Sequence, residues 1–148
     1  MYIFKCNDVM NIQAAAIINQ IQKIAGQLPY IVAGDFNAVP SSSVYKMITL
    51  GVNPRISVSK VYKSVPKFFI TSLISAYFAL QGREPEYTNY SQTKNMPIFF
   101  KDTIDYIFYR KMRVEKVLHV RDDFPTSTFP NEEEPSDHLP IGATLNFL

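Results

Sequence analysis

One stretch, from Pro29 to Pro40 (PYIVAGDFNAVP), constrains the fold of this 148-residue chain more than any other. Its β-branched and aromatic residues favour a buried strand, and Gly34 allows a bend or a close approach. Because side chains of an extended chain alternate with a period of two, Asp35 and Asn37 are expected to project to the same side. The stretch therefore predicts a strand that ends in a carboxylate and a carboxamide. A site for metal-bound water and phosphate explains this pair, and so does an ordinary Asx turn.

Two stretches nearer the C-terminus favour the site. The first is TIDYIFYR at residues 103–110, a strand pattern with Asp105 at its otherwise apolar start. The second is PSDHLP at residues 135–140, which places Asp137 and His138 before an alternating apolar run. Loops held by a rigid scaffold often carry chemistry. Motifs this far apart can converge only at the same end of neighbouring strands, so we expect them at one edge of a sheet.

The three motifs in this order resemble those of the endonuclease/exonuclease/phosphatase superfamily, whose members carry Gly-Asp-x-Asn, then an Asp in an apolar strand, then Ser-Asp-His. Three stretches and a dipeptide further resemble the deadenylase branch, namely Ser75–Tyr77, Tyr87–Tyr90, Phe100-Lys101 and Asp105–Tyr109. That branch comprises the carbon-catabolite-repressor exonucleases, nocturnin and the Angel proteins. The resemblance runs from about Ile12 to the C-terminus, and it covers only the C-terminal half of the family's domain.

The resemblance implies an α/β (α+β) fold that is part of a four-layer sandwich, in which two mainly antiparallel β-sheets are flanked by helices. We expect residues 1–148 to be one unit, the C-terminal half of such a domain. No composition shift or linker divides the chain in two.

Periodicity predicts several further elements. An apolar stripe predicts a helix from about Met10 to Ala25, with Ile17 and Ile24 among its core-facing residues and Asn11 on its wet side. Ser41 or Ser42 at one end and Gly51 at the other predict a short second helix. Further segments are predicted: a buried one at Phe68–Leu80 and strands at Tyr87–Tyr90, Arg113–Arg121 and the alternating run that starts at Ile141.

The resemblance also implies a role for each motif residue. Asp35 would orient or deprotonate the attacking water, and Asn37 would donate to a phosphate oxygen. Asp35 and Asp137 would lie next to a Mg²⁺ ion, with Mn²⁺ as an alternative, because hard cations prefer carboxylate oxygens. His138 would hold a nonbridging phosphate oxygen, and Asp105 would accept a hydrogen bond from its ring and favour its charged form. We expect these five side chains to line one cavity.

The substrate that the resemblance implies is the poly(A) tail of RNA, shortened by 3′-to-5′ phosphodiester hydrolysis, with a deadenylase complex as a candidate partner. Phe100, helped by Phe99 or Tyr87, would stack on the terminal base, as aromatic rings do for single strands. Packing in the core is the competing interpretation of these rings. Two other interpretations remain open. The chain could belong to another phosphoesterase of the superfamily, either a phosphatase of nucleotide cofactors or inositol phosphates or an abasic-site nuclease. It could also be a catalytically dead interaction module.

The family places a metal-binding Asn, a metal-binding Glu and an Asn-x-His strand in the first half of its domain, ahead of anything in this chain. We therefore expect the chain alone to be inactive, and its open sheet edges and exposed apolar face to favour self-association. Asp102 stands where many relatives have glycine, which puts a negative charge close to the expected substrate path.

Charge, cysteine content and apolar runs limit the partners and the cellular compartment that we expect for this chain. The formal net charge of +2 is too small to indicate nucleic acid by itself. A local run of positive charge, Arg55, Lys60, Lys63 and Lys67, fits either a solvated loop or an approach path for a polyanion. The single cysteine, Cys6, excludes an internal disulfide and fits a reducing compartment. No apolar run is long enough to span a membrane. We expect a cytoplasmic protein without a membrane partner; a nuclear location is the alternative, and upstream sequence could add an organellar signal.

Overall fold

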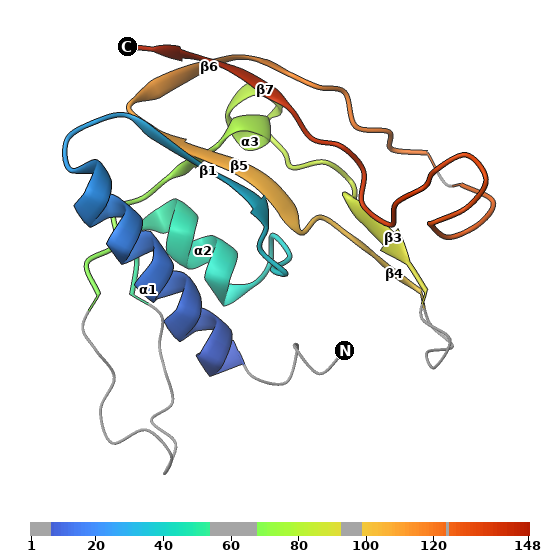
Figure 1. Ribbon diagram of the computed structural model, residues 1–148, viewed down its shortest axis with the longest axis horizontal. Coiled ribbons are helices and arrows are strands. Elements are labelled where there is room, and N and C mark those ends of the chain that lie inside the picture. Colours follow the sequence, from blue (N-terminus) through green and yellow to red (C-terminus); the bar gives the residue numbers. More distant parts are fainter. Residues whose placement is uncertain (1–6, 54–67, 93–98, 124) are drawn as a thin grey trace.

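The structure is a computed structural model that describes residues 7–53, 68–92, 99–123 and 125–148 (Figure 1). Three helices and seven strands occur in these ranges, in the order α1 (Asn7–Ala25), β1 (Tyr30–Asp35), α2 (Ser43–Leu50), β2 (Ile74–Ser75), α3 (Ala76–Gln81), β3 (Asn89–Ser91), β4 (Phe100–Asp102), β5 (Asp105–Arg110), β6 (Met112–Val117) and β7 (Ala143–Phe147). The positively charged run between Arg55 and Lys67 lies outside the described residues.

The paired strands β1 to β7 of the described ranges are all antiparallel, and an isolated bridge between Ser91 and Phe129 is parallel. One sheet has the order β1-β5-β2, and two further pairs join β3 to β4 and β6 to β7. Strands β1 and β5 pair along their full length, from Tyr30 opposite Arg110 to Asp35 opposite Asp105. The predicted α/β class with mainly antiparallel sheets is therefore confirmed.

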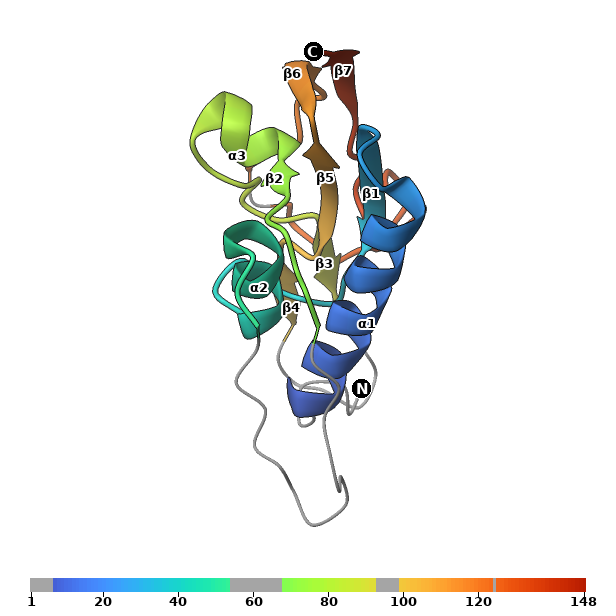
Figure 2. The same ribbon diagram turned by 90° about the vertical axis from the view of Figure 1, so that its left-hand side faces the viewer.

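Strand β5 is central because both of its faces are buried. Tyr106 and Phe108 point to a core shared with α1 and α2, and Ile107 and Tyr109 point to a second core shared with α3, β6 and β7. This division follows from the two-residue period of a strand. Both views show α1 and α2 together on one side of β1 and β5 (Figures 1 and 2). The layers thus run from α1 and α2 through the β5 sheet to α3 and the β6–β7 pair.

Helix α2 begins and ends where the sequence predicts. The Ser42 hydroxyl accepts from the backbone N–H of Tyr45 at 3.2 Å, which satisfies one of the free donors at the helix start. Gly51 ends the helix with a left-handed φ of 67°. A Cβ at this position would lie 2.8 Å from the backbone nitrogen of Ser72, so only glycine fits there.

Helix α1 differs from its prediction in which side chains it buries. Ala15 and Ile18 are buried, but Ile17 and Ile24 are 57% and 77% exposed, so their predicted core packing is wrong within the described residues. Asn11 was expected to face water, yet it is buried and accepts a 2.9 Å hydrogen bond from the Ser43 hydroxyl of α2. Helix contacts therefore follow the positions of α2 and β1 more than hydrophobicity alone.

Several other segments are shorter or more exposed than predicted. The segment Phe68–Leu80 is not uniformly buried, since Phe69 is 81% exposed. The strand expected at Tyr87–Tyr90 starts at Asn89, and the strand expected at Arg113–Arg121 ends at Val117. No helix in the described ranges has the length and apolar character of a membrane span.

Removing the Phe108 ring is expected to destabilise the fold strongly. This side chain is fully buried, stacks on Tyr106 with ring centres 5.1 Å apart and meets the edge of Phe36. Phe108→Ala should lower the free energy of unfolding by about 3–5 kcal/mol, because a cavity replaces the ring. Phe147→Ala, at a position 76% exposed, should change it by less than about 0.5 kcal/mol. Urea denaturation followed by circular dichroism measures both, and equal losses would contradict the assigned core.

Candidate active site

The end of β1 and the start of β5 bring two carboxylates to the same sheet edge. Asp35 lies opposite Asp105 in the strand register, and the backbone N–H of Phe36 donates to the carbonyl of Ile104 at 2.8 Å. This last bond extends the pairing one residue past β1. The sheet edge predicted to carry chemistry therefore holds one residue from each of the first two motifs.

Asn37 contacts Asp35 for a different reason from the predicted one. The strand ends at Asp35, and Asn37 adopts a left-handed φ of 48°, so the two do not share a strand face. Instead the Asn37 backbone N–H donates to Asp35 Oδ1 at 2.7 Å and its side-chain nitrogen donates to Oδ2 at 3.1 Å. The Asx-type turn is thus present, and it fixes the orientation of the Asp35 carboxylate.

His138 lies against Asp105 as predicted. Its Nδ1 is 2.9 Å from Asp105 Oδ2, and the two side chains are 32% and 12% exposed. Burial lowers the pKa of His138, but the hydrogen bond and charge of Asp105, with the charges of Asp137 and Asp35, together raise that pKa above its ordinary value. Since Nδ1 is engaged, Nε2 is the ring nitrogen that can meet a substrate oxygen.

Strand β3 and the residue before it tie the Ser-Asp-His segment to β5. The Thr88 hydroxyl, fully buried, accepts from the backbone N–H groups of Ile104 and Asp105 at 3.0 and 3.1 Å. The Thr88 carbonyl accepts from the N–H of Leu139 at 2.7 Å. These bonds hold the segments carrying Asp105 and His138 in one place. The sequence analysis assigned no role to Thr88. The signal that could have indicated one is the pair of polar residues, Thr88 and Asn89, between two tyrosines of a predicted strand.

Asp137 is held by the same strand. Its backbone carbonyl accepts from the N–H of Tyr90 at 3.1 Å, and its Oδ2 accepts from the Asn89 side chain at 3.3 Å. The Ser136 hydroxyl accepts from the N–H of His138 at 3.0 Å. The Ser-Asp-His segment is therefore anchored by backbone and side-chain bonds on both sides of Asp137.

The expectation of one cavity for all five side chains is not met by the cavity that holds Asp35 and Asn37. This cavity has a volume of about 330 Å³ and lies between α1 and β1, where Met10, Ile17 and other apolar side chains line it. Asp105, Asp137 and His138 do not line it. The five residues gather at one sheet edge, with the α1 groove reaching it from one side.

Among the aromatic rings proposed to stack on a base, Tyr87 is in the wrong place. It is fully buried, donates through its hydroxyl to the carbonyl of Asp123, and carries the Lys101 ammonium 4.3 Å above its ring. Its role is core packing. Phe99 is 51% exposed and Phe100 is partly exposed at the start of β4, so base stacking by these two rings stays a prediction.

Asp102 lies at the end of β4, close to the Asp105 turn. Its Oδ1 accepts from the backbone N–H of Thr103 at 2.8 Å. Burial raises the pKa of Asp102, the Thr103 bond lowers it, and the charge of Glu86 raises it further, with a net rise. The carboxylate is thus partly committed to the turn that precedes β5.

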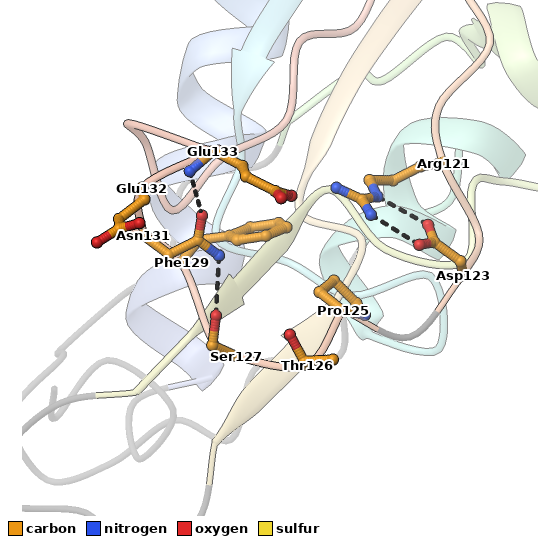
Figure 3. A pocket seen from close by; sticks show the side chains of 9 residues that line it. All are labelled: Arg121, Asp123, Pro125, Thr126, Ser127, Phe129, Asn131, Glu132 and Glu133. Atoms are coloured by element: carbon orange, nitrogen blue, oxygen red, sulfur yellow. Dashed lines mark hydrogen bonds and ion pairs between the residues drawn. The ribbon is translucent and has the colours of Figure 1, made fainter.

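A cavity of about 480 Å³ away from this edge lies within the loop between β6 and the Ser-Asp-His segment (Figure 3). Its polar groups bind one another. Arg121 pairs with Asp123 at 2.7 Å and with Glu134 at 3.2 Å, and Asn131 donates to the Ser127 hydroxyl. Glu134, the last residue of the acidic run Glu132–Glu134, is therefore paired with Arg121. The cavity therefore lies inside a loop whose polar side chains pair with one another.

The donors near the edge fit a hard cation. Asp35 and Asp137 offer carboxylate oxygens, and each oxygen that accepts one hydrogen bond keeps a lone pair. Mg²⁺ commonly binds through one or two carboxylates and keeps several waters. In the described ranges no three His, Cys, Asp or Glu side chains come close enough together to hold a metal ion by themselves. A cation at this edge would therefore have at most two such protein ligands from the described residues.

The His138–Asp105 pair makes stability depend on pH in a defined direction. The pKa of His138 in the folded state is raised above 6.5. The stabilisation by the His138–Asp105 pair is therefore fully present below the pKa of His138 in the unfolded state, and it is lost as pH rises through the pKa of His138 in the folded state. Asp105→Asn should lower the pKa of His138, and its stability deficit relative to the wild type should shrink as the histidine deprotonates. A ring titration by NMR and urea denaturation at several pH values measure both effects. A wild-type midpoint at or below 6.5, or one unchanged in Asp105→Asn, would contradict the assignment.

Comparison with known proteins identifies the family of this chain. Residues 12–138 match the model of the Endonuclease/Exonuclease/phosphatase family. The chain is 26% identical over 168 residues to the CCR4-Not complex 3'-5'-exoribonuclease subunit Ccr4 of Saccharomyces cerevisiae, covering 97% of this chain and 19% of that protein. It is 33% identical over 120 residues to the Carbon catabolite repressor protein 4 homolog 4 of Arabidopsis thaliana, covering 76% of this chain and 26% of that protein. The chain therefore spans well under half the length of these relatives.

Solved structures agree. The human Nocturnin catalytic domain with a bound sulfate anion superposes with a TM-score of 0.63 at 27% identity, over 97% of this chain and 43% of that domain. A mannosyl-6-phosphatase of Bacteroides thetaiotaomicron superposes with a TM-score of 0.51 at 20% identity, over 90% of this chain and 44% of that one, and so shares the fold. Motifs, sheet order and matched residues together show that this chain belongs to the endonuclease/exonuclease/phosphatase family, on the branch of the Ccr4-like and nocturnin-like proteins.

Proposed function

We propose that the chain supplies part of the active site of a metal-dependent 3′-to-5′ exoribonuclease that shortens poly(A). The hydrogen bond between His138 and Asp105, set at the sheet edge where Asp35 lies opposite Asp105, carries this proposal. A largely buried carboxylate that favours the charged form of a histidine, beside a second carboxylate, is suited to hydrolysis at a phosphate. The histidine meets the anionic oxygen, and the second carboxylate acts on the water.

Each residue has a task in the proposed reaction. Asp35, fixed by two hydrogen bonds from Asn37, orients the attacking water and accepts its proton. His138 donates through Nε2 to a nonbridging phosphate oxygen, while Asp105 keeps its ring charged and correctly turned. Asn37 donates to a phosphate oxygen once substrate competes with Asp35 for its amide.

Asp35 and Asp137 would hold the metal ion, Mg²⁺ with Mn²⁺ as the alternative. A bound divalent ion would supply Lewis-acid stabilisation of the charge on phosphorus and lower the pKa of the nucleophilic water. The protein side of this proposal is the pair of carboxylates and the hydrogen bonds that hold them in place.

Substrate and partners are inferred from the names of the relatives. Two similar proteins are Ccr4 exoribonuclease subunits of CCR4-Not complexes, from Saccharomyces cerevisiae and Encephalitozoon cuniculi. We infer RNA as the substrate class, poly(A) as the preferred sequence and a deadenylase complex as the partner, with the cytoplasm as the place of action. The likeness to the mannosyl-6-phosphatase supports only the fold, so it does not favour a phosphatase.

The proposal predicts activity that depends on the rest of the domain. The 148-residue chain alone should not shorten oligo(A), because the family's other metal-binding Asn and Glu lie in the other half of the domain. Fusion behind the N-terminal half of a deadenylase domain should give shortening that requires Mg²⁺ or Mn²⁺. Gel analysis of end-labelled oligo(A), with and without EDTA, measures both.

Substitutions in the fused protein separate catalysis from folding. Asp35→Ala should reduce the rate by about 10²- to 10⁴-fold, as loss of a general base does. Asp122→Ala is the control, since this exposed carboxylate makes only a loose pair with Arg83 at 3.8 Å. If the chain alone shortened oligo(A), or Asp35→Ala kept full activity, the proposed division of the site would be wrong.

Phe100 tests the choice of substrate. If its ring stacks on the terminal base, Phe100→Ala should cost about 1–3 kcal/mol of RNA binding and leave hydrolysis of a small phosphate ester almost unchanged. Phe147→Ala removes a comparably large ring from an exposed position in β7 and serves as control. Rates on oligo(A) and on the small ester decide, and equal losses on the two substrates would assign the ring to packing.

A further inference from the structure

Asn89 in β3 is a buried amide placed directly behind the Ser-Asp-His segment. It is 3% exposed, and its backbone forms an antiparallel bridge with His138. Its side-chain nitrogen donates to Asp137 Oδ2 at 3.3 Å. The side chain therefore reaches a carboxylate of the site from the inner side of the protein.

The orientation of this amide is determined by its two neighbours. An ionised carboxylate can only accept, so the atom facing Asp137 must be the amide nitrogen. The carbonyl oxygen then faces Ser91, whose hydroxyl donates to Asn89 Oδ1 at 2.8 Å. Ser91 and Asn89 are two residues apart in one strand and so share a face. A chain of donors thus runs from Ser91 through Asn89 to Asp137.

A buried amide is costly unless its polar atoms are bonded, and here both atoms have partners that fix its direction. Thr88, the preceding residue, accepts from the N–H of Asp105. Neighbouring residues of one short segment thus hold both acidic residues of the C-terminal motifs, one through its backbone and the other through its carboxylate.

We propose that Asn89 is a positioning residue for Asp137, and that Ser91 fixes the direction of its amide. The hydrogen bond from Asn89 holds the Asp137 carboxylate in one orientation at the sheet edge, where it could meet a divalent cation. The link to the cation rests on the proposed function, whereas the positioning of the carboxylate does not.

The experiment uses the isotope-labelled 148-residue chain and four variants. Ser91→Ala removes the hydroxyl that directs the amide, Ser91→Thr keeps a hydroxyl there, and Asn89→Leu removes the amide without adding charge. Asn146→Leu is the matched control, because Asn146 also donates to a carboxylate, Glu115 Oε2 at 2.9 Å, but on the exposed surface of the β6–β7 pair. Circular dichroism and thermal unfolding confirm that each variant is folded.

Two NMR measurements test the positioning without any metal. In Ser91→Ala, solvent exchange of the Asn89 side-chain amide should accelerate about tenfold, as expected for loss of one buried hydrogen bond. The side-chain carboxyl carbon signal of Asp137 should shift in Ser91→Ala and Asn89→Leu and should stay at its wild-type position in Ser91→Thr and Asn146→Leu. Unchanged Asn89 exchange and an unchanged Asp137 signal in folded Ser91→Ala would overturn the proposal, as would an equal effect of Asn146→Leu.

A Mn²⁺ titration of the same variants, each fused behind the N-terminal half of a deadenylase domain so that the other metal-binding residues are present, separates this inference from the proposed function. Paramagnetic broadening around Asp137 should need several-fold more Mn²⁺ in Ser91→Ala and Asn89→Leu than in the wild type. If the wild type shows no broadening there while the metal-free signals respond as expected, the positioning stands and the metal-dependent function fails. If broadening is identical in all variants and the metal-free signals do not respond, the positioning is wrong and the metal site stands.

Discussion

The antiparallel pairing of β1 with β5 is the interaction on which the rest of this structure depends. Its register places Asp35 opposite Asp105, and its central strand separates the two main cores. A shift by one residue would turn Tyr106 and Phe108 away from α1 and α2, and would separate the two carboxylates. The geometry of the candidate site and the packing of the cores are therefore determined by the same backbone hydrogen bonds.

Electrostatics at this edge are arranged by hydrogen bonds more than by ion pairs. Asp35 accepts from Asn37, Asp105 accepts from His138, and Asp137 accepts from Asn89. Each of the three carboxylates thus has its own hydrogen-bond partner, which is an asparagine amide or the histidine ring. These hydrogen bonds fix the orientation of each carboxylate.

Local sequence signals predicted what local forces determine. Ser42 and Gly51 mark the ends of α2 because caps act within one turn, and the three motifs predicted the His138–Asp105 contact through a family resemblance. The exposure of Ile17, the burial of Asn11 and the burial of Tyr87 could not be read from the chain, because each depends on which distant element packs beside it. The same is true of Thr88, Asn89 and Glu134, whose partners lie in other segments.

Contacts between residues that are far apart in the sequence influence how this chain folds. The Tyr106 hydroxyl donates to the carbonyl of Ala38, 68 positions earlier, and His138 meets Asp105 across a further 33 positions. Contacts between such remote parts of a chain carry a large loop-closure entropy and slow folding. On a ribosome, Asp35 would emerge about 70 residues before Asp105, its partner in the opposite strand. The sheet edge that carries Asp35, Asp105 and His138 is therefore expected to be among the last parts of the molecule to become ordered.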